Sequence, residues 1–145
     1  MNRELLQRFE ENAIQFRELE SREEILDFAG GREAVREGEI SFTLAEAVIM
    51  ETGSLVLGSR FPGARRAAFL AEEHRALFPR ENCFENLADY LKKRGVPPGD
   101  LTLITGPSRT ADIEKVLVLG AHGPRRLLLA SAAGELIEEV FGVKP

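Results

Sequence analysis

The sequence predicts one globular α/β domain with a mainly parallel sheet flanked by helices. Three observations support this fold class. Short apolar runs typical of strands alternate with amphipathic helical segments along the chain. The last third runs strand, helix, strand, helix, an order that indicates parallel strands joined by right-handed crossovers. The length of 145 residues is that of a single domain, which buries roughly two-thirds of the surface that its unfolded chain exposes.

The first part of the chain, residues 1–39, is predicted to be a helical segment, and residues 40–145 are predicted to form the α/β domain. A first helix is expected over residues 3–20, where apolar residues recur at three- and four-residue steps. Ser21 followed by Glu24 is a capping box, which predicts the start of a second, short helix. A pair of glycines then ends that helix.

Short strands are expected to follow. The predicted strands of this part cover residues 40–44, 48–50, 54–57, 67–71 and 76–78. The second and third of them are predicted to form a hairpin around Gly53, because glycine readily takes the positive φ that a tight turn needs.

The remaining elements are predicted from caps and apolar spacing. Asn82 with Glu85 is a cap signal, which predicts a helix running to about Arg94. Residues 113–119 have apolar side chains at helical spacing, and their valines leave a strand as the alternative. The other predicted elements are strands over residues 101–105 and 127–130 and a helix over residues 135–141 that Gly142 closes.

The charge and the cysteine content of the chain argue against several classes of function. The formal net charge is −5, from 19 Lys and Arg against 24 Asp and Glu, which argues against non-specific binding to nucleic acid. The single cysteine, Cys83, excludes an internal disulfide and a cysteine-rich metal or iron–sulfur site. No apolar run approaches the ~18 residues of a membrane span, and the N-terminus lacks the pattern of a signal peptide. We therefore expect a cytoplasmic protein that binds no membrane.

Polar side chains concentrate between two apolar runs in residues 103–124. The first run stops at Gly106, and Ser108, Arg109 and Thr110 follow before an expected helix. Open α/β sheets bind ligands beyond the carboxyl ends of their strands, and a helix N-terminus attracts anions. The glycine would let a ligand approach the backbone, the hydroxyls would bind it, and the guanidinium matches a carboxylate or phosphate. These residues predict an anion site.

The same residues also have a purely structural interpretation. Ser108 or Thr110 would cap the helix, Asp112 would complement its dipole, and Arg109 would lie in solvent. The glycine spacing matches neither a dinucleotide fingerprint nor a phosphate loop. Residue types alone leave both interpretations open.

Glu51 and His122 are the candidate catalytic residues. His122 lies in a Gly/Pro turn, where its imidazole could serve as an acid or base near neutral pH or could only tie down the turn. Glu51, with Thr52, lies at the hairpin turn and could reach a ligand or only shape the turn. His74 is expected at the surface, and because the two histidines share no ligand spacing, no metal site is expected. Cys83 is expected in the first turn of a helix, with a packing role.

Four stretches together resemble one family. Residues 105–114, TGPSRTADIE, and 117–124, LVLGAHGP, resemble the signature of the lactate-utilisation protein C family, also called LUD-domain or YkgG-like proteins. Residues 40–43, ISFT, and 49–57, IMETGSLVL, resemble the family's segment around Glu-Thr-Gly. The resemblance covers about residues 40–131.

The resemblance implies a fold similar to the sugar-phosphate isomerase and CoA-transferase group (NagB/RpiA/CoA-transferase-like). It implies an accessory, non-redox subunit in the oxidation of L-lactate to pyruvate, without a cofactor of its own. Such a subunit would act with partner subunits that carry iron–sulfur clusters, and would bind a small carboxylate or related anion. The expected ligand-binding residues are Thr52, Gly53, Gly106, Ser108, Arg109, Thr110, Asp112, His122 and Gly123.

Two features depart from the family pattern. Only short helices are predicted before Ile40, where family members usually carry more sheet, so a second copy of the chain in a homodimer is one way to complete the pocket. Ser41 and Ala47 stand where glycine and an aromatic residue are common. Two other functions stay open: an enzyme or binding protein for a phosphorylated or CoA-linked metabolite, with Glu51 or His122 as base, and an interaction module without a ligand.

Overall fold

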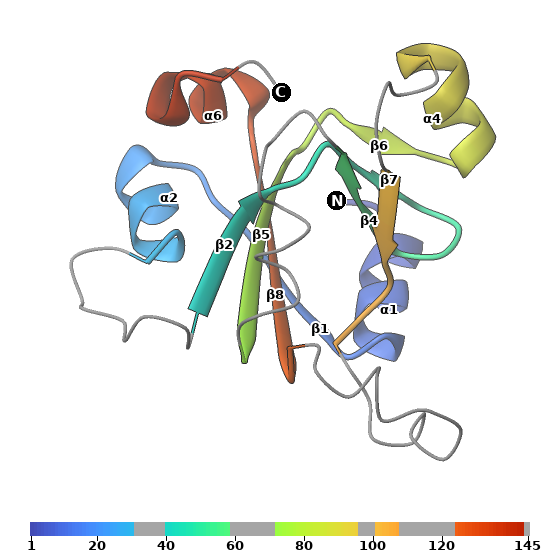
Figure 1. Ribbon diagram of the computed structural model, residues 1–145, viewed down its shortest axis with the longest axis horizontal. Coiled ribbons are helices and arrows are strands. Elements are labelled where there is room, and N and C mark those ends of the chain that lie inside the picture. Colours follow the sequence, from blue (N-terminus) through green and yellow to red (C-terminus); the bar gives the residue numbers. More distant parts are fainter. Residues whose placement is uncertain (31–39, 59–71, 96–100, 108–123, 144–145) are drawn as a thin grey trace.

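The computed structural model describes residues 1–30, 40–58, 72–95, 101–107 and 124–143. These residues form two four-stranded sheets, and helices lie on both sides of the pair (Figure 1). The fold is therefore α/β, as the sequence predicts.

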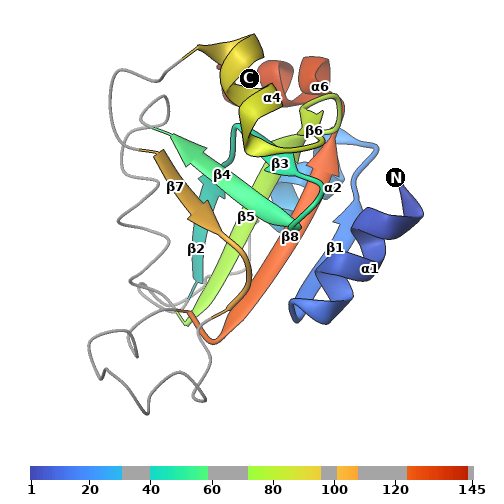
Figure 2. The ribbon, with the colours of Figure 1, turned by 90° about the vertical axis from the view of Figure 1, so that its right-hand side faces the viewer.

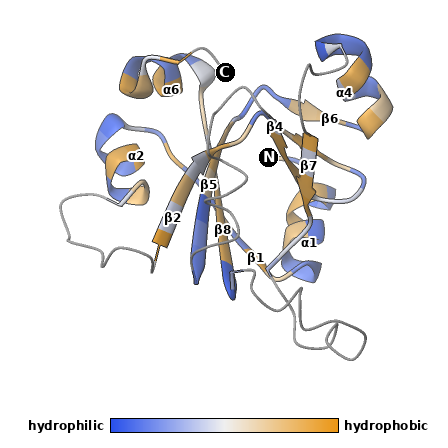
Figure 3. Cartoon of the chain, in the orientation of Figure 1, coloured by the Kyte–Doolittle hydropathy of each residue, from blue (hydrophilic) through white to orange (hydrophobic). Residues whose placement is uncertain are grey.

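The main sheet is entirely parallel. Its strand order is β1-β8-β5-β2, with the bounds β1 Ile14–Glu18, β8 Arg126–Ala132, β5 Glu73–Pro79 and β2 Ile40–Leu44. Their amino-terminal ends lie at one edge, where Figure 3 shows hydrophilic ends on β5 and β8. The strands are consecutive in space but distant in sequence, which is why crossovers must connect them.

The second sheet is mixed. Its order is β6-β3-β4-β7, with the bounds β6 Cys83–Phe84, β3 Ala47–Ile49, β4 Ser54–Gly58 and β7 Leu101–Ile104. The β3–β6 pair is parallel, whereas β3–β4 and β4–β7 are antiparallel. Figure 2 shows this sheet lying across one face of the main sheet.

The described helices have the bounds α1 Arg3–Glu11, α2 Arg22–Phe28, α4 Leu87–Arg94 and α6 Gly134–Phe141. Helices α1, α2 and α6 cover the two faces of the main sheet, and helix α4 packs against the second sheet. Helices α2 and α6 cover one face, which we call the outer face, and bury a core with Leu77 and Ala130 at its centre. Helix α1 and the second sheet cover the other, inner face, where Phe9, Phe78 and Leu129 are fully buried. Apolar burial on both faces explains the apolar run 127–130 in the central strand β8, whereas the edge strands β1 and β2 alternate apolar and polar residues.

Most predicted elements are confirmed. Ser21 accepts a hydrogen bond from the Glu24 backbone at the start of α2, as the capping box predicts. Gly53 takes a φ of 71° in the β3–β4 hairpin, and Gly142 ends α6 with a φ of 69°. The strands expected at residues 67–71 and the element expected at 113–119 lie outside the described residues.

The prediction of one helix over residues 3–20 is wrong in its second half. Helix α1 ends at its C-cap Asn12, Ala13 takes a φ of 58°, and β1 follows at once. The spacing of Phe9, Ala13 and Phe16 fits a helix and that of Ile14 and Phe16 fits a strand, so spacing could not separate the two. Residues 14–18 form a strand because they pair with β8. The division at residue 40 stays a prediction, although β1 already belongs to the main sheet.

Two predictions about the second half are also wrong. Cys83 does not begin a helix, because it pairs with Val48 in β6, and the helix cap is Asn86, which accepts from the Asp89 backbone. Strand β7 does not pair in parallel with β8. It completes the second sheet by pairing antiparallel with β4.

Candidate functional site

The described residues that flank segment 108–123 lie at the amino-terminal edge of the main sheet. On one side, Gly106 packs against the backbone of Asn12, just before β1. On the other side, the Arg125 backbone N–H donates to the Glu72 carbonyl oxygen over 2.7 Å, just before β5. Figure 2 shows the chain beyond β7 running toward the edge where β5 and β8 begin.

This position corrects the geometry on which the anion-site prediction was based. The rule for open sheets places ligands beyond the carboxyl ends of parallel strands. Strand β7 belongs to the mixed second sheet, and its carboxyl end points to the amino-terminal edge of the main one. A ligand held by the polar segment would thus be expected at the amino-terminal edge.

A chain of hydrogen bonds runs through the predicted site residue Thr52. The Asn12 side chain donates to the Thr52 carbonyl oxygen over 2.9 Å. The Thr52 hydroxyl lies 2.7 Å from the Ser54 hydroxyl, which lies 2.8 Å from the hydroxyl of Thr105. This chain links the end of α1, the β3–β4 turn and the end of β7. It brings Thr52 and Gly53 together with Gly106.

Close packing explains why both glycines stand here. A Cβ at Gly53 would lie 3.0 Å from the Arg8 Cβ and 3.0 Å from the Asn12 side-chain nitrogen. A Cβ at Gly106, whose φ is 154°, would lie 2.6 Å from the Asn12 carbonyl oxygen. The backbone that approaches Gly106 is therefore that of α1, which supports the structural interpretation of this glycine.

The other predicted site residues divide into two groups. Glu51 is exposed at the hairpin turn, and its backbone N–H donates to the Glu85 carbonyl oxygen over 3.1 Å. The predicted role of the Glu51 carboxylate stays a prediction. The remaining predicted residues lie outside the described residues: Ser108, Arg109, Thr110, Asp112, His122 and Gly123.

His74 is a candidate that the sequence analysis missed, because it is buried and not at the surface. The ring is fully buried on the inner face, and its Nε2 lies 2.7 Å from the Thr43 hydroxyl. Burial lowers the pKa of His74 from 6.5 to about 4, so the ring is neutral at neutral pH. The two-residue period of β5, which groups this histidine with Ala76 and Phe78, is the signal that could have found it.

The residues beside His74 in sequence face the other way. Glu73 lies on the outer face, where its carboxylate pairs with Arg75 over 2.7 Å and with Arg126 over 3.0 Å. Arg75 also donates to the Phe28 carbonyl oxygen, which ties α2 to the sheet. The described charged residues at this end of β5, Glu73 and Arg75, therefore lie on the outer face.

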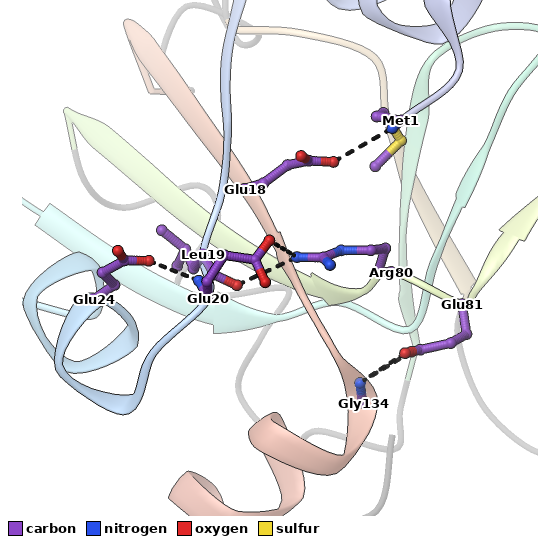
Figure 4. Close-up of polar contacts among 8 residues, drawn as sticks. All are labelled: Met1, Glu18, Leu19, Glu20, Glu24, Arg80, Glu81 and Gly134. Carbon is purple, nitrogen blue, oxygen red and sulfur yellow. Dashed lines mark hydrogen bonds and ion pairs between the residues drawn. The ribbon is translucent and has the colours of Figure 1, made fainter.

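The carboxyl edge of the main sheet carries a different set of polar contacts (Figure 4). Arg80 binds the Glu20 carboxylate over 2.7 Å and the Leu19 carbonyl oxygen over 3.3 Å. The Glu81 carboxylate accepts from the Gly134 backbone at the start of α6, over 3.0 and 3.2 Å. These contacts hold the ends of β1 and β5 and the start of α6 together.

Cys83 is expected to react slowly with thiol reagents. Burial raises the pKa of its thiol, and the Sγ lies 3.7 Å from the Arg80 carbonyl oxygen, to which the thiol donates. Because the thiolate is the reactive species, we expect labelling by a disulfide reagent at pH 7.5 to be several-fold slower than that of glutathione. Urea should restore the normal rate. A native rate equal to that of glutathione would contradict the placement of Cys83.

The described residues include no group of three or more His, Cys, Asp or Glu side chains placed to hold a metal ion. Among the described helices, none is long and apolar enough to cross a membrane.

Comparison with known proteins identifies the family. The family model of the LUD domain matches residues 2–129. The chain belongs to the LUD domain family. The match begins well before residue 40, where the sequence resemblance was expected to begin, and it includes β1. The part before Ile40 therefore contributes a strand to this LUD domain, which corrects the expectation of helices alone.

Several relatives carry the name lactate utilization protein C. That of Geobacillus thermodenitrificans is 31% identical over 101 residues, covering 65% of this chain and 42% of the relative. That of Anoxybacillus flavithermus is 34% identical over 95 residues, covering 63% and 43%. An uncharacterized protein of Neisseria meningitidis serogroup B is 36% identical over 96 residues, covering 63% and 41%. In each comparison the match spans less than half of the relative.

A solved structure shares the fold of this LUD domain. The crystal structure of a DUF162 family protein from Deinococcus radiodurans superposes with a TM-score of 0.62 at 16% identity, covering 90% of this chain and 94% of that chain. At this identity the similarity establishes the architecture alone.

Proposed function

We propose that this LUD domain serves in lactate utilisation as a non-redox accessory subunit in the oxidation of L-lactate to pyruvate. In this role it binds a small carboxylate or related anion and acts with iron–sulfur partner subunits. The observation that carries the proposal is the match to relatives named lactate utilization protein C, such as the one at 31% identity. The match spans 42% of that relative, so the proposal concerns what this domain contributes.

Two features of the chain support a non-redox role with partners. A single cysteine cannot hold an iron–sulfur cluster, whose common forms need four ligands. Oxidation of a hydroxy acid requires an electron acceptor, which partner subunits with clusters would supply. The polar segment that begins after Gly106 supplies hydroxyls and a guanidinium suited to a carboxylate.

Replacing Arg109 by alanine is expected to abolish stabilisation by the ligand. The guanidinium is the residue type that best matches a carboxylate, whereas a solvated arginine contributes little to folding, so the free energy of unfolding without ligand should change by less than about 1 kcal/mol. Thermal unfolding with and without L-lactate or pyruvate measures both quantities. Arg22→Ala, at an exposed position of α2, is the matched control. A large loss of stability without ligand would make Arg109 structural.

Affinity capture tests the partnership. The tagged chain is recovered from its own organism grown on L-lactate, and a parallel culture is grown on another carbon source. We expect iron–sulfur subunits and stoichiometric iron in the eluate from lactate-grown cells. An eluate with this chain alone and no iron would contradict the accessory role. Screening of phosphorylated and CoA-linked metabolites would then be the next step.

A further inference from the structure

Two buried polar atoms on the inner face of the main sheet have unused hydrogen-bonding capacity. The Ser41 Oγ and the His74 Nδ1 are both inaccessible to solvent, and neither has a partner among the described residues. Buried polar atoms in native proteins nearly always have a partner in the protein, in water or in a ligand. The hydroxyls of Thr52, Ser54 and Thr105, in contrast, already bind one another.

The two unpartnered atoms belong to neighbouring residues on the same face of the sheet. Ser41 and His74 are register partners on the neighbouring parallel strands β2 and β5. Thr43 lies two residues along β2 and contacts His74, and residues two apart share a face of the sheet. The Ser41 side chain therefore lies on the same inner face as the imidazole. The Thr43 hydroxyl contacts the Nε2 of the ring. The Nδ1 has no partner among the described residues, and Ser41 is the register partner of this histidine.

Among the described residues, the side chains around the His74 ring are uncharged. Burial alone shifts the pKa of His74, and no charged group of the described residues contributes to that shift. From β2 the ring faces the uncharged Ser41 and Thr43, and from β8 its register partner is Leu127. Helix α1 and the second sheet contribute apolar side chains to this core, which are Leu5, Phe9, Val48, Leu55 and Leu57. Glu73 and Arg75 point to the outer face, and the Arg125 backbone is bonded next to the start of β5.

We propose that Ser41, Thr43 and His74 bind the carboxylate group of a small organic acid between the two sheets, at the amino-terminal edge of the main sheet. This inference rests on the proposed function and gives the carboxylate partners other than Arg109, so that Ser41→Ala and Arg109→Ala test two alternative sets of partners. The Ser41 hydroxyl and the His74 Nδ1–H donate to the carboxylate oxygens. The ring takes up one proton from solvent on binding, and its Nε2–H donates to the Thr43 hydroxyl oxygen. The bound anion is then paired with an imidazolium, a charge-assisted contact that offsets the cost of burying both groups.

The first test follows the imidazole of the intact chain by NMR while pyruvate or L-lactate is added at pH 6.5. The chain has only two histidines, so comparison with His74→Gln assigns the signals. We expect the His74 ring signals to move to imidazolium values on saturation. Calorimetry at several pH values should show the Kd falling by up to about tenfold for each unit of pH lowered, because one proton is taken up with each ligand. Binding of either acid with unmoved His74 signals would overturn the site.

The second test uses paired serine variants. Ser41→Ala removes one donor to the ligand, and the Kd for pyruvate should rise by about tenfold or more, as expected for a hydrogen bond to a charged group. Ser131 is the matched control, because its hydroxyl is also buried and unpartnered among the described residues, at the far end of β8. Ser131→Ala should leave the Kd unchanged.

The outcomes separate this inference from the proposed function. Tight binding that neither Ser41→Ala nor His74→Gln weakens would overturn the site while the accessory role stands. Absence of binding by the wild-type chain to both acids would overturn the site and the ligand part of the proposed function, whereas capture of iron–sulfur subunits still decides the partnership.

Discussion

Lowering the pH from 7 to 4 is expected to reduce the free energy of unfolding by about 3 kcal/mol through His74 alone. The pKa of His74 is about 4 in the folded chain, because burial disfavours the imidazolium, and 6.5 in a solvated chain. Between these values the unfolded chain binds a proton that the folded chain does not. Stability is therefore fully present above pH 6.5 and is lost progressively as the pH falls toward 4.

Urea unfolding at pH 7, 6, 5 and 4 measures this loss. Because other groups also contribute to the pH dependence, the wild-type curve is compared with that of His74→Gln. Relative to that of His74→Gln, the free energy of unfolding of the wild-type chain should fall by about 3 kcal/mol from pH 7 to pH 4, since glutamine does not titrate. Parallel curves for the two variants would show that His74 is solvated in the folded chain. A saturating carboxylate that binds at His74 should lessen the acid sensitivity of the wild-type chain.

Gly106→Ala is expected to destabilise the domain by about 3 kcal/mol. The new Cβ would lie 2.6 Å from the Asn12 carbonyl oxygen, and that atom belongs to the backbone at the end of α1, which cannot rotate away. The φ of 154° adds strain for any residue with a side chain. Either β7 or α1 must shift, and overpacking of this kind costs about 1–3 kcal/mol beyond the backbone strain.

Gly142→Ala is the control that separates the clash from the strain. Gly142 has a φ of 69° at the end of α6, and nothing lies within 4 Å of the position of its Cβ. We expect this variant to lose about 1 kcal/mol, the cost of a left-handed backbone with an open surrounding. Denaturation by urea of both variants measures the difference. Equal losses would contradict the close approach of α1 to the end of β7.

The elements that the sequence predicts correctly are those with local causes. The β3–β4 hairpin follows from Gly53, whose freedom to take positive φ sets the turn. Helix α2 follows from Ser21, whose hydroxyl accepts a hydrogen bond from the backbone of Glu24 three residues later. In each of these the sequence signal and its structural effect lie within a few residues.

The wrong predictions concern elements whose structure depends on pairing with distant parts of the chain. Residues 14–18 fit a helical period and become a strand only because β8 is available to pair with them. Strand β7 has the apolar composition of a parallel strand, yet it pairs antiparallel with β4 in the second sheet. His74 looked like a surface residue beside two glutamates, but β5 lies between β2 and β8 and the inner-face core buries the ring. Local patterns carry no information about such pairings.

The candidate site shows the same division. The turn residues Thr52, Gly53 and Gly106 were predicted as one site from family resemblance, and the structure does bring them together. Their immediate partner is Asn12, which no motif indicated, because it contributes through a helix end far away in the sequence.

The measurement that tests the central claim most directly is L-lactate oxidation in cell extract. Extract from a strain that lacks this chain is assayed for L-lactate-dependent reduction of an electron-acceptor dye, with and without the purified chain. If the chain is an accessory subunit of lactate oxidation, the extract should lose activity and regain it on addition of the chain, but the chain alone should reduce no dye. Unchanged activity in the deficient extract would contradict the proposed function.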